Sequence, residues 1–194
     1  MADKKITALT AGTPVSTDII PYVSDPSGSA VTQKATLSSF LPRVLFSTVT
    51  SVGNVGAGED DLYSYTLPAS TFSVDLQSIH INMAGYIIGH ASGTRTIKIY
   101  FGGTQIFTSG ALAETSNCSW TASVLLIRQS SSIVKYRVDF VRRTTTSNIA
   151  VASVTGLTLT NTQIFKVTGE SSTATNNDVA FYSGHGIWYP IPSL

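Results

Sequence analysis

The chain has 194 residues, of which 42% are hydrophobic and 12% are charged, and its formal net charge is +1. Globular proteins average about 25% charged residues, so this chain carries roughly half the usual proportion. The hydrophobic content excludes the signature of disorder, and a near-neutral charge gives no basic field for binding nucleic acid through its phosphates. A chain of this length can bury a core of its own, which predicts one main folded domain.

The N-terminal residues 1–43 differ in composition from the rest of the chain, because prolines interrupt short apolar pairs. Residues 19–23 predict a short strand, residues 25–29 a turn, and residues 30–37 a returning strand. A two-stranded hairpin is marginally stable in water unless it packs on something else. We therefore expect residues 1–43 to form an arm that docks on its own domain, on symmetry mates or on a different protein.

Residues 44–194 show the alternation of apolar and polar residues that is typical of half-buried β-strands. The clearest case is 134–140, where Val, Tyr, Val and Phe alternate with Lys, Arg and Asp. Further strands are predicted at 44–49, 62–67, 79–83, 97–101, 104–108, 120–127, 149–159, 163–168 and 179–189. Gly102 and Gly103 predict a tight hairpin turn. Since no segment has an apolar period of 3.6 residues, we predict an all-β fold, an antiparallel β-sandwich or jelly roll over residues 44–194.

The titratable residues do not form a recognisable metal motif. His80, His90 and His185 lack the close spacing of metal-binding histidines and are predicted to lie on polar strand faces. The acidic residues of 58–61 lack the spacing of an EF-hand loop, and we expect them to form a solvated loop before the strand at Leu62. We expect no metal and no cofactor.

Catalytic motifs are also missing from the sequence. A Gly-x-Ser-x-Gly turn and a Walker-type phosphate loop are absent, and residues 182–186 match the first only superficially. A catalytic triad stays open, because its members converge in space rather than along the chain. Eleven carboxylates are few for acid–base chemistry, which favours a protein that is not an enzyme. The competing hypothesis, a carbohydrate-processing enzyme, predicts a pair of carboxylates facing a groove.

Location is constrained by three features of the sequence. Apolar runs such as 86–88 and 124–127 are far shorter than the ~20 residues of a membrane helix. Residues 1–5 lack the apolar core of a signal peptide, and Cys118 is the only cysteine, so no intrachain disulfide can form. These features predict a soluble protein, made in a cytoplasm, that binds neither membrane nor nucleic acid.

Aromatic residues gather near the C-terminus at Tyr182, Trp188 and Tyr189. One hypothesis is a platform that stacks on glycans, and the other is a combination of sandwich core and subunit interface, where aromatic residues are also enriched. We favour the second. The low charge points the same way, because permanent interfaces are depleted in Lys, Glu and Asp. The sequence therefore predicts a structural subunit that makes lasting contacts.

Three runs in the arm, at 5–10 (KITALT), 17–23 (TDIIPYV) and 32–36 (TQKAT), resemble the N-termini of tailed-bacteriophage virion proteins. In that family a K-I-x-x-L-T start leads to a T-D-x-x-P-x-V strand and then to a T-x-K-x-T strand. Residues 61–68 and 98–107 also resemble β-sandwich domains of phage appendages and capsid decorations, as does the run at 166–170. The resemblance implies an N-terminal segment that attaches to the particle and a β-domain that projects from it or covers it, commonly in trimers.

The resemblance leads us to expect a non-enzymatic virion protein, assembled in the host bacterial cytoplasm: a homotrimeric capsid decoration or cement protein that bridges neighbouring subunits of the major capsid protein. The alternative is a tail or head fibre or spike, attached to tail or neck proteins by the same arm and binding host surface glycans. The length of the chain favours decoration, because receptor-binding fibres usually continue into a shaft or a large tip. We expect the anchoring contacts from the apolar residues of the arm: Ile6, Leu9, Ile19, Ile20, Val23, Leu37 and Phe40.

Overall fold

The computed structural model describes the backbone of residues 19–24, 31–36, 41–142 and 146–190, and the side chains of 41–142 and 148–190. The chain divides into two compact units, Met1–Leu41 and Pro42–Leu194.

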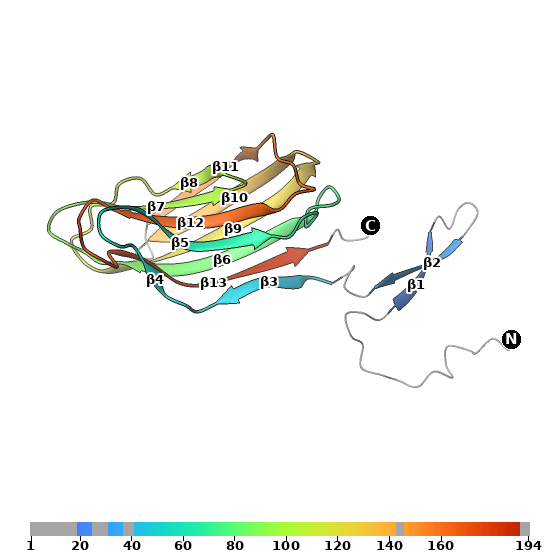
Figure 1. Cartoon of the computed structure of the whole chain (residues 1–194), viewed down its shortest axis with the longest axis horizontal. Helices are drawn as coiled ribbons and strands as arrows, with labels where there is room; N and C mark the ends of the chain where they lie inside the picture. Colours follow the sequence, from blue (N-terminus) through green and yellow to red (C-terminus); the bar gives the residue numbers. More distant parts are fainter. Residues whose placement is uncertain (1–18, 25–30, 37–40, 143–145, 191–194) are drawn as a thin grey trace, which may run out of the picture. The chain divides into compact units, whose positions relative to one another are not determined.

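In the first unit, β1 (Ile19–Ser24) pairs with β2 (Val31–Thr36) in antiparallel register (Figure 1). The register runs from Ile19 opposite Thr36 to Ser24 opposite Val31. The two predicted strands of the arm are therefore confirmed, and the predicted turn between them lies outside the described residues.

The second unit is a sandwich of two antiparallel sheets, which confirms the predicted all-β fold class (Figure 1). The larger sheet has the order β11-β10-β9-β6-β13-β3, and β4 also pairs with β13. The smaller sheet has the order β5-β12-β7-β8. The strands are β3 (Arg43–Thr48), β4 (Val52–Gly53), β5 (Gly58–Leu67), β6 (Ser78–Ile87), β7 (Arg95–Phe101), β8 (Thr104–Thr108), β9 (Cys118–Ser130), β10 (Ile133–Arg142), β11 (Thr146–Val154), β12 (Gln163–Ser171) and β13 (Val179–Tyr189).

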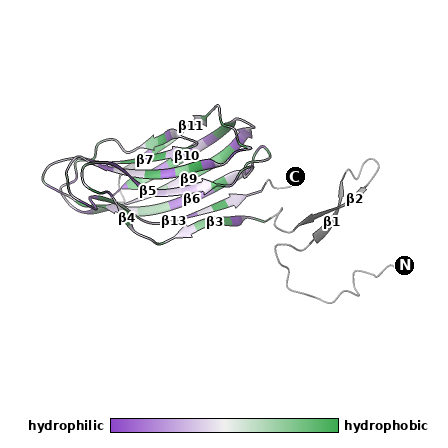
Figure 2. Cartoon of the chain, viewed as in Figure 1, coloured by the Kyte–Doolittle hydropathy of each residue, from purple (hydrophilic) through white to green (hydrophobic). Residues whose placement is uncertain are grey.

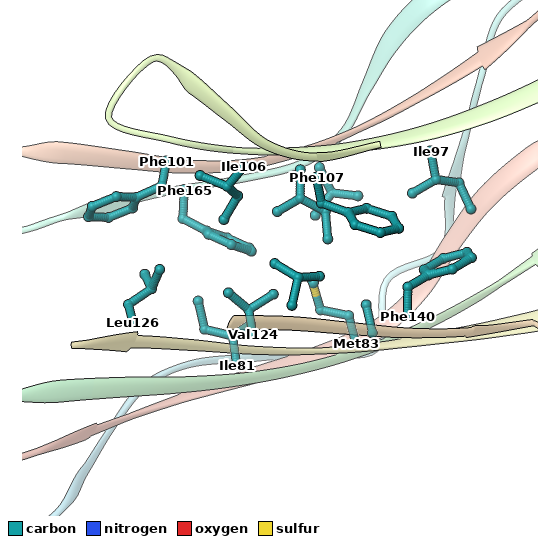
Figure 3. Close-up of a cluster of buried hydrophobic side chains, with 14 of the residues drawn as sticks. Ile81, Met83, Ile97, Phe101, Ile106, Phe107, Val124, Leu126, Phe140 and Phe165 are labelled. Carbon is teal, nitrogen blue, oxygen red and sulfur yellow. The ribbon is translucent and has the colours of Figure 1, made fainter. Parts of the chain in front are cut away.

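The core lies between the inner faces of the two sheets. Figure 3 shows Phe101 and Phe165 of the smaller sheet facing Val124 and Leu126 of the larger one, and all four side chains are buried. Along β6 the burial pattern alternates strictly, as half-buried and buried residues succeed one another. The same alternation is visible as bands of hydrophobic and hydrophilic residues along the strands (Figure 2). Each large side chain removed from water in this way contributes roughly 1.5–3 kcal/mol.

The strands predicted between residues 44 and 189 are all present, with small differences at their ends. The exception is the predicted strand at 149–159, which ends at Val154 because Gly156 has a φ of 73°. The predicted hairpin turn is confirmed, since Gly102 and Gly103 have φ values of 56° and 80°, which favour glycine. The two-residue strand β4 was not predicted, because a run this short carries no period.

The two ends of the sandwich differ in their connections. Arg43 at the start of β3 pairs with Trp188 near the end of β13, so the sandwich is entered and left at one end. At the opposite end, here called the loop end, Ile87 pairs with both Cys118 and Val179. The longer loops 88–94, 109–117 and 172–178 therefore meet at the loop end.

Candidate functional site

The predicted anchoring residues fall into two groups. Ile19, Ile20 and Val23 lie in β1, where the backbone pairs with β2. The anchoring role of this strand stays a prediction. The other four lie outside the described residues: Ile6, Leu9, Leu37 and Phe40.

The three C-terminal aromatic residues do not form one platform. Trp188 is 7% exposed, its Nε1 donates a hydrogen bond to the carbonyl of Thr71 at 3.0 Å, and the Arg43 guanidinium lies 4.8 Å from its ring centroid. Tyr182 is 58% exposed at the bulge of β13, and Tyr189 is half-buried. Because neighbouring residues of a strand point to opposite faces, Trp188 and Tyr189 face opposite sides of the sheet. Trp188 is a core residue, as the second hypothesis for these aromatics predicts.

The acidic residues of 58–61 are largely exposed, as predicted, but the predicted loop is wrong, because these residues form the start of β5. Glu59 pairs with Glu170 of β12 in the register, and both carboxylates contact Lys98 of β7, whose Nζ lies 2.6 and 2.8 Å from their Oε2 atoms. The Tyr100 hydroxyl and Thr168 Oγ1 donate to Glu59 Oε1 at 2.8 and 2.7 Å. We call these five side chains the ionic cluster, and it lies on the outer face of the smaller sheet.

The ionic cluster holds Glu59 as a carboxylate. Burial alone would raise the pKa of Glu59, but the hydrogen bonds from Lys98, Thr168 and Tyr100 outweigh it and lower the pKa to about 2. The same carboxylates raise the pKa of Lys98. Burial and the hydrogen bond to Glu59 raise the pKa of Tyr100. Glu59 and Lys98 are therefore charged and paired with one another over the ordinary pH range.

The carboxylates of Glu59 and Glu170, which share the Lys98 ammonium, are a pair that the rival enzyme hypothesis could use. A glycosidase needs one carboxyl that keeps its proton near neutral pH so that it can act as the general acid. A pKa of about 2 at Glu59 is the reverse of that requirement, and an ammonium lies between the two groups. The expectation that the chain is not an enzyme stays a prediction.

A cavity of about 340 Å³ adjoins the ionic cluster on the same face. Its lining includes Asp61, whose Oδ1 lies 2.9 Å from Lys166 Nζ, and Ser64. Lys166 Nζ also lies 5.2 Å from the centroid of the Tyr100 ring. This surface combines one aromatic ring with paired charges, a set of groups that can bind the hydroxyls of a neutral polar ligand.

The outer face of the larger sheet is more apolar than the outer face of the smaller sheet, which carries the ionic cluster. The registers align one row of residues across six strands on this face: Val44, Ile187, His80, Leu125, Arg137 and Val151. Val151 is 70% exposed, and Ile149, on the same strand and face, is 61% exposed. A shallow hollow of about 160 Å³ lies beside them, lined in part by Leu125 and Ile127. Exposed apolar residues that adjoin one another in this way suit an interface.

A buried polar network holds the loop end together. Asp178 is fully buried and accepts hydrogen bonds from His90 Nε2 at 2.7 Å, Ser171 Oγ at 2.8 Å and Thr173 Oγ1 at 2.5 Å. Burial by itself would raise the pKa of Asp178, but these hydrogen bonds lower it. Arg95 is also fully buried, with Nη2 at 3.6 Å from Asp178 Oδ2. The network ties loops 88–94 and 172–178 to the start of β7.

A second polar residue in the same region is Asn54. It is fully buried; its backbone N–H and its side-chain Oδ1 bond to the carbonyl and the N–H of Val179, and its Nδ2 donates to Thr175 and Gly56. Sequence reasoning missed Asn54, Asp178 and Arg95, because their partners lie up to 125 residues away. The only signal in the sequence for such a network was a polar residue, such as Asn54, that lies between predicted apolar strands.

The three histidines take different positions. His80 and His185 lie on strands of the larger sheet, on its outer face, and His80 Nε2 lies 2.8 Å from Ser123 Oγ. Both are on strands as predicted, but the face is not a polar one, because His80 lies between Ile187 and Leu125 in the register. His90 instead bonds to the buried Asp178. Among the described residues, no group of three His, Cys, Asp or Glu side chains could hold a metal ion. No helix in the described part of the chain has the length and apolarity that crossing a membrane requires.

Comparison with known proteins identifies no family for the chain. No family model matches the chain, and no curated protein does. Among solved structures, the chain is similar to lectin UEA-II complexed with galactose, with a TM-score of 0.37, 10% identity, and coverage of 78% of this chain and 93% of that chain.

Two further similar structures come from viruses. One is the VP2 subviral particle of infectious bursal disease virus, with a TM-score of 0.34, 14% identity, and coverage of 89% of this chain but 38% of that chain. The other is the CBM2 module of the evolved Dit of Lactobacillus casei BL23 phage J-1, with a TM-score of 0.33, 9% identity, and coverage of 68% and 70%. Identities and TM-scores this low assign no function to the chain.

Proposed function

We propose that the chain is a non-enzymatic structural protein of a bacteriophage virion, a homotrimeric capsid decoration protein that bridges neighbouring capsid subunits. The observation that carries the proposal is the division into two units. The first unit contains, in its described part, two strands of six residues each. A hairpin of this size is stable only when it packs on another surface, so it suits an anchor that becomes ordered on assembly.

The mechanism follows from coupling folding to attachment. An arm that is stable only when docked spends part of its binding free energy on ordering, so each single contact is weak. A trimer presents three such arms to one particle, and the second and third then bind at high effective concentration. Many copies would hold neighbouring capsid proteins together, while the sandwich with its exposed apolar face would make the lateral contacts.

The test of this proposal is the amount of the protein in purified particles, measured by quantitative mass spectrometry against the major capsid protein. We expect hundreds of copies, and a large loss of incorporation when Ile20→Asp and Val23→Asp are combined in β1. The matched control is Tyr182→Asp, which adds a charge at an exposed position of the sandwich and should leave incorporation unchanged. A protein that is absent from purified particles would contradict the proposal.

The fibre alternative rests on two specific observations, the exposed Tyr182 and the cavity beside Tyr100. Aromatic rings and paired polar groups on an accessible surface suit a glycan ligand. In this alternative only a few copies would be found, at the tail or at one vertex, and the protein would bind host cells or a glycan array. Tyr182→Ala or Tyr100→Ala would then reduce adsorption without changing incorporation.

A further inference from the structure

The edge strand β11 lacks the features that natural proteins use to keep exposed strand edges from pairing. It spans nine residues, Thr146–Val154, which is about 30 Å of strand. Its register with β10 runs from Arg142 opposite Thr146 to Val134 opposite Val154 without a bulge. It contains no charged residue and no proline. Charges, prolines and bulges are the usual protection, and a long regular edge without them is a template for pairing with another chain.

The space beside this edge is open. An open groove of about 560 Å³ separates β11 from β8, the edge strand of the smaller sheet, and is lined by residues of both strands: Gln105, Ile106, Phe107, Thr108, Asn148, Ile149 and Ala150. Among the described residues, no side chain bridges this gap by a hydrogen bond or ion pair that would close it. A strand from another chain can therefore approach the free backbone groups of β11.

We propose that β11 pairs with β11 of a second copy of this chain, in antiparallel register about a two-fold axis at Ala150. This register uses the full strand, because Ala150 is the midpoint of Thr146–Val154. It places Ile149 of one copy opposite Val151 of the other, twice. β-Branched side chains such as these pack well against their cross-strand neighbours on a pleated sheet.

Charge also favours a second copy as the occupant. Arg137 of β10 is the register partner of Val151, and Asp139 is the register partner of Ile149. The two cross-strand rows through Ile149 and Val151 therefore each begin with Arg137 in one copy and end with Asp139 in the other. Within each copy these two side chains also form an ion pair with one another, so the second copy meets no unpaired charge in these rows. The pairing brings no like charges opposite one another, and it joins the apolar outer faces of both sheets into one surface.

The proposal concerns the sandwich alone and does not rest on the proposed virion function. Its first test is the mass of the full chain in solution by light scattering. We expect an even number of copies: six where the proposed trimer also forms, because β11 pairing would join two trimers, and two where it does not. The double variant Ile149→Lys/Val151→Lys should have half that number, because two pairs of lysines would then lie directly opposite one another. The control is Val55→Lys/Ile164→Lys, which adds the same charge at exposed residues away from β11 and should leave the mass unchanged.

The second test reads the register by disulfide formation. A mixture of Ile149→Cys and Val151→Cys chains should form a crosslinked pair under mild oxidation, whereas each variant alone should not, because its cysteines would lie two residues out of register. Cys118 is buried and present in all samples. A wild-type chain with an odd number of copies, a double lysine variant of unchanged mass, or equal crosslinking in the single-variant samples would each overturn the proposal.

Discussion

The two long sides of the sandwich, where edge strands of the two sheets meet, are completed in different ways. On one side β3 and β5 meet, and the centroid of the Phe46 ring lies 5.1 Å from that of Tyr63 and 4.8 Å from that of Tyr65. Tyr63 in turn stacks on Phe181 at 4.9 Å. On the other side β8 and β11 are separated by the open groove. We call these the aromatic side and the open side.

The edge strands differ in charge as well. β5 contains Glu59, Asp60 and Asp61, each of which has a partner: Lys98, the N–H of Val55 and Lys166 respectively. β8 and β11 contain no charged residue. The chain therefore protects one side with its own side chains and leaves the other side suited to a partner, because exposed edges without charge are prone to pairing.

The largest effect is expected from a cavity on the aromatic side. Phe46→Ala removes a buried ring that contacts two tyrosines, so the free energy of unfolding should fall by about 3–5 kcal/mol. Urea denaturation of the purified protein measures the change. A loss below about 1 kcal/mol, the usual result for an exposed residue, would show that this side is not packed as described.

Acid should weaken the aromatic side next. The pKa of Glu59 is about 2 in the folded state and near 4.5 when unfolded, so its stabilising contribution is complete above 4.5 and is lost as the pH falls toward 2. After allowance for solvent screening this is about 1–2 kcal/mol. The free energy of unfolding should therefore fall over that pH range. Equal stability at both ends of the range would contradict the pairing of Glu59.

The variant Lys98→Met tests the same contribution of Glu59 to stability by removing its partner. The variant leaves Glu59 and Glu170 facing each other without their ammonium, so we expect a loss of about 1 kcal/mol at neutral pH. Its stability should also fall less steeply in acid than that of the wild type, because the pKa of Glu59 returns toward its ordinary value. Lys135→Met, at an exposed position of the larger sheet, is the matched control and should leave the acid dependence unchanged.

The smallest effect is expected on the open side. Val151→Thr keeps a β-branched residue at an exposed position, so the free energy of unfolding of the single chain should change by less than about 0.5 kcal/mol. Denaturation at low protein concentration, where association is weak, gives this value. A large loss would mean that the side chain packs inside its own sandwich.

The strands were predictable because alternation is a local property. The pattern at 134–140 places Val134, Val138 and Phe140 in the core, as the structure confirms. The acidic residues of β5 were misassigned as a loop because their strand is stabilised by partners far along the chain: Lys98 is 39 residues from Glu59 and 72 from Glu170. No local pattern encodes such a contact.

The candidate surfaces were less predictable for the same reason. Trp188 and Tyr189 look equivalent in sequence, and only the choice of which face of β13 is turned to the core decides which one is buried. Sheet order also decides that β11 is an edge strand whose uncharged sequence matters. The run at 149–159 was enough to predict a strand, but the identity of its neighbours required the whole fold.

The most direct test of the proposed virion role is cryo-electron microscopy of phage particles purified from cells that express the chain. We expect density for this β-sandwich at many positions on the head, with residues of β1 and β2 packed against neighbouring virion proteins. Particles whose head surface lacks the sandwich, or a sandwich whose β1–β2 hairpin contacts only solvent, would contradict it.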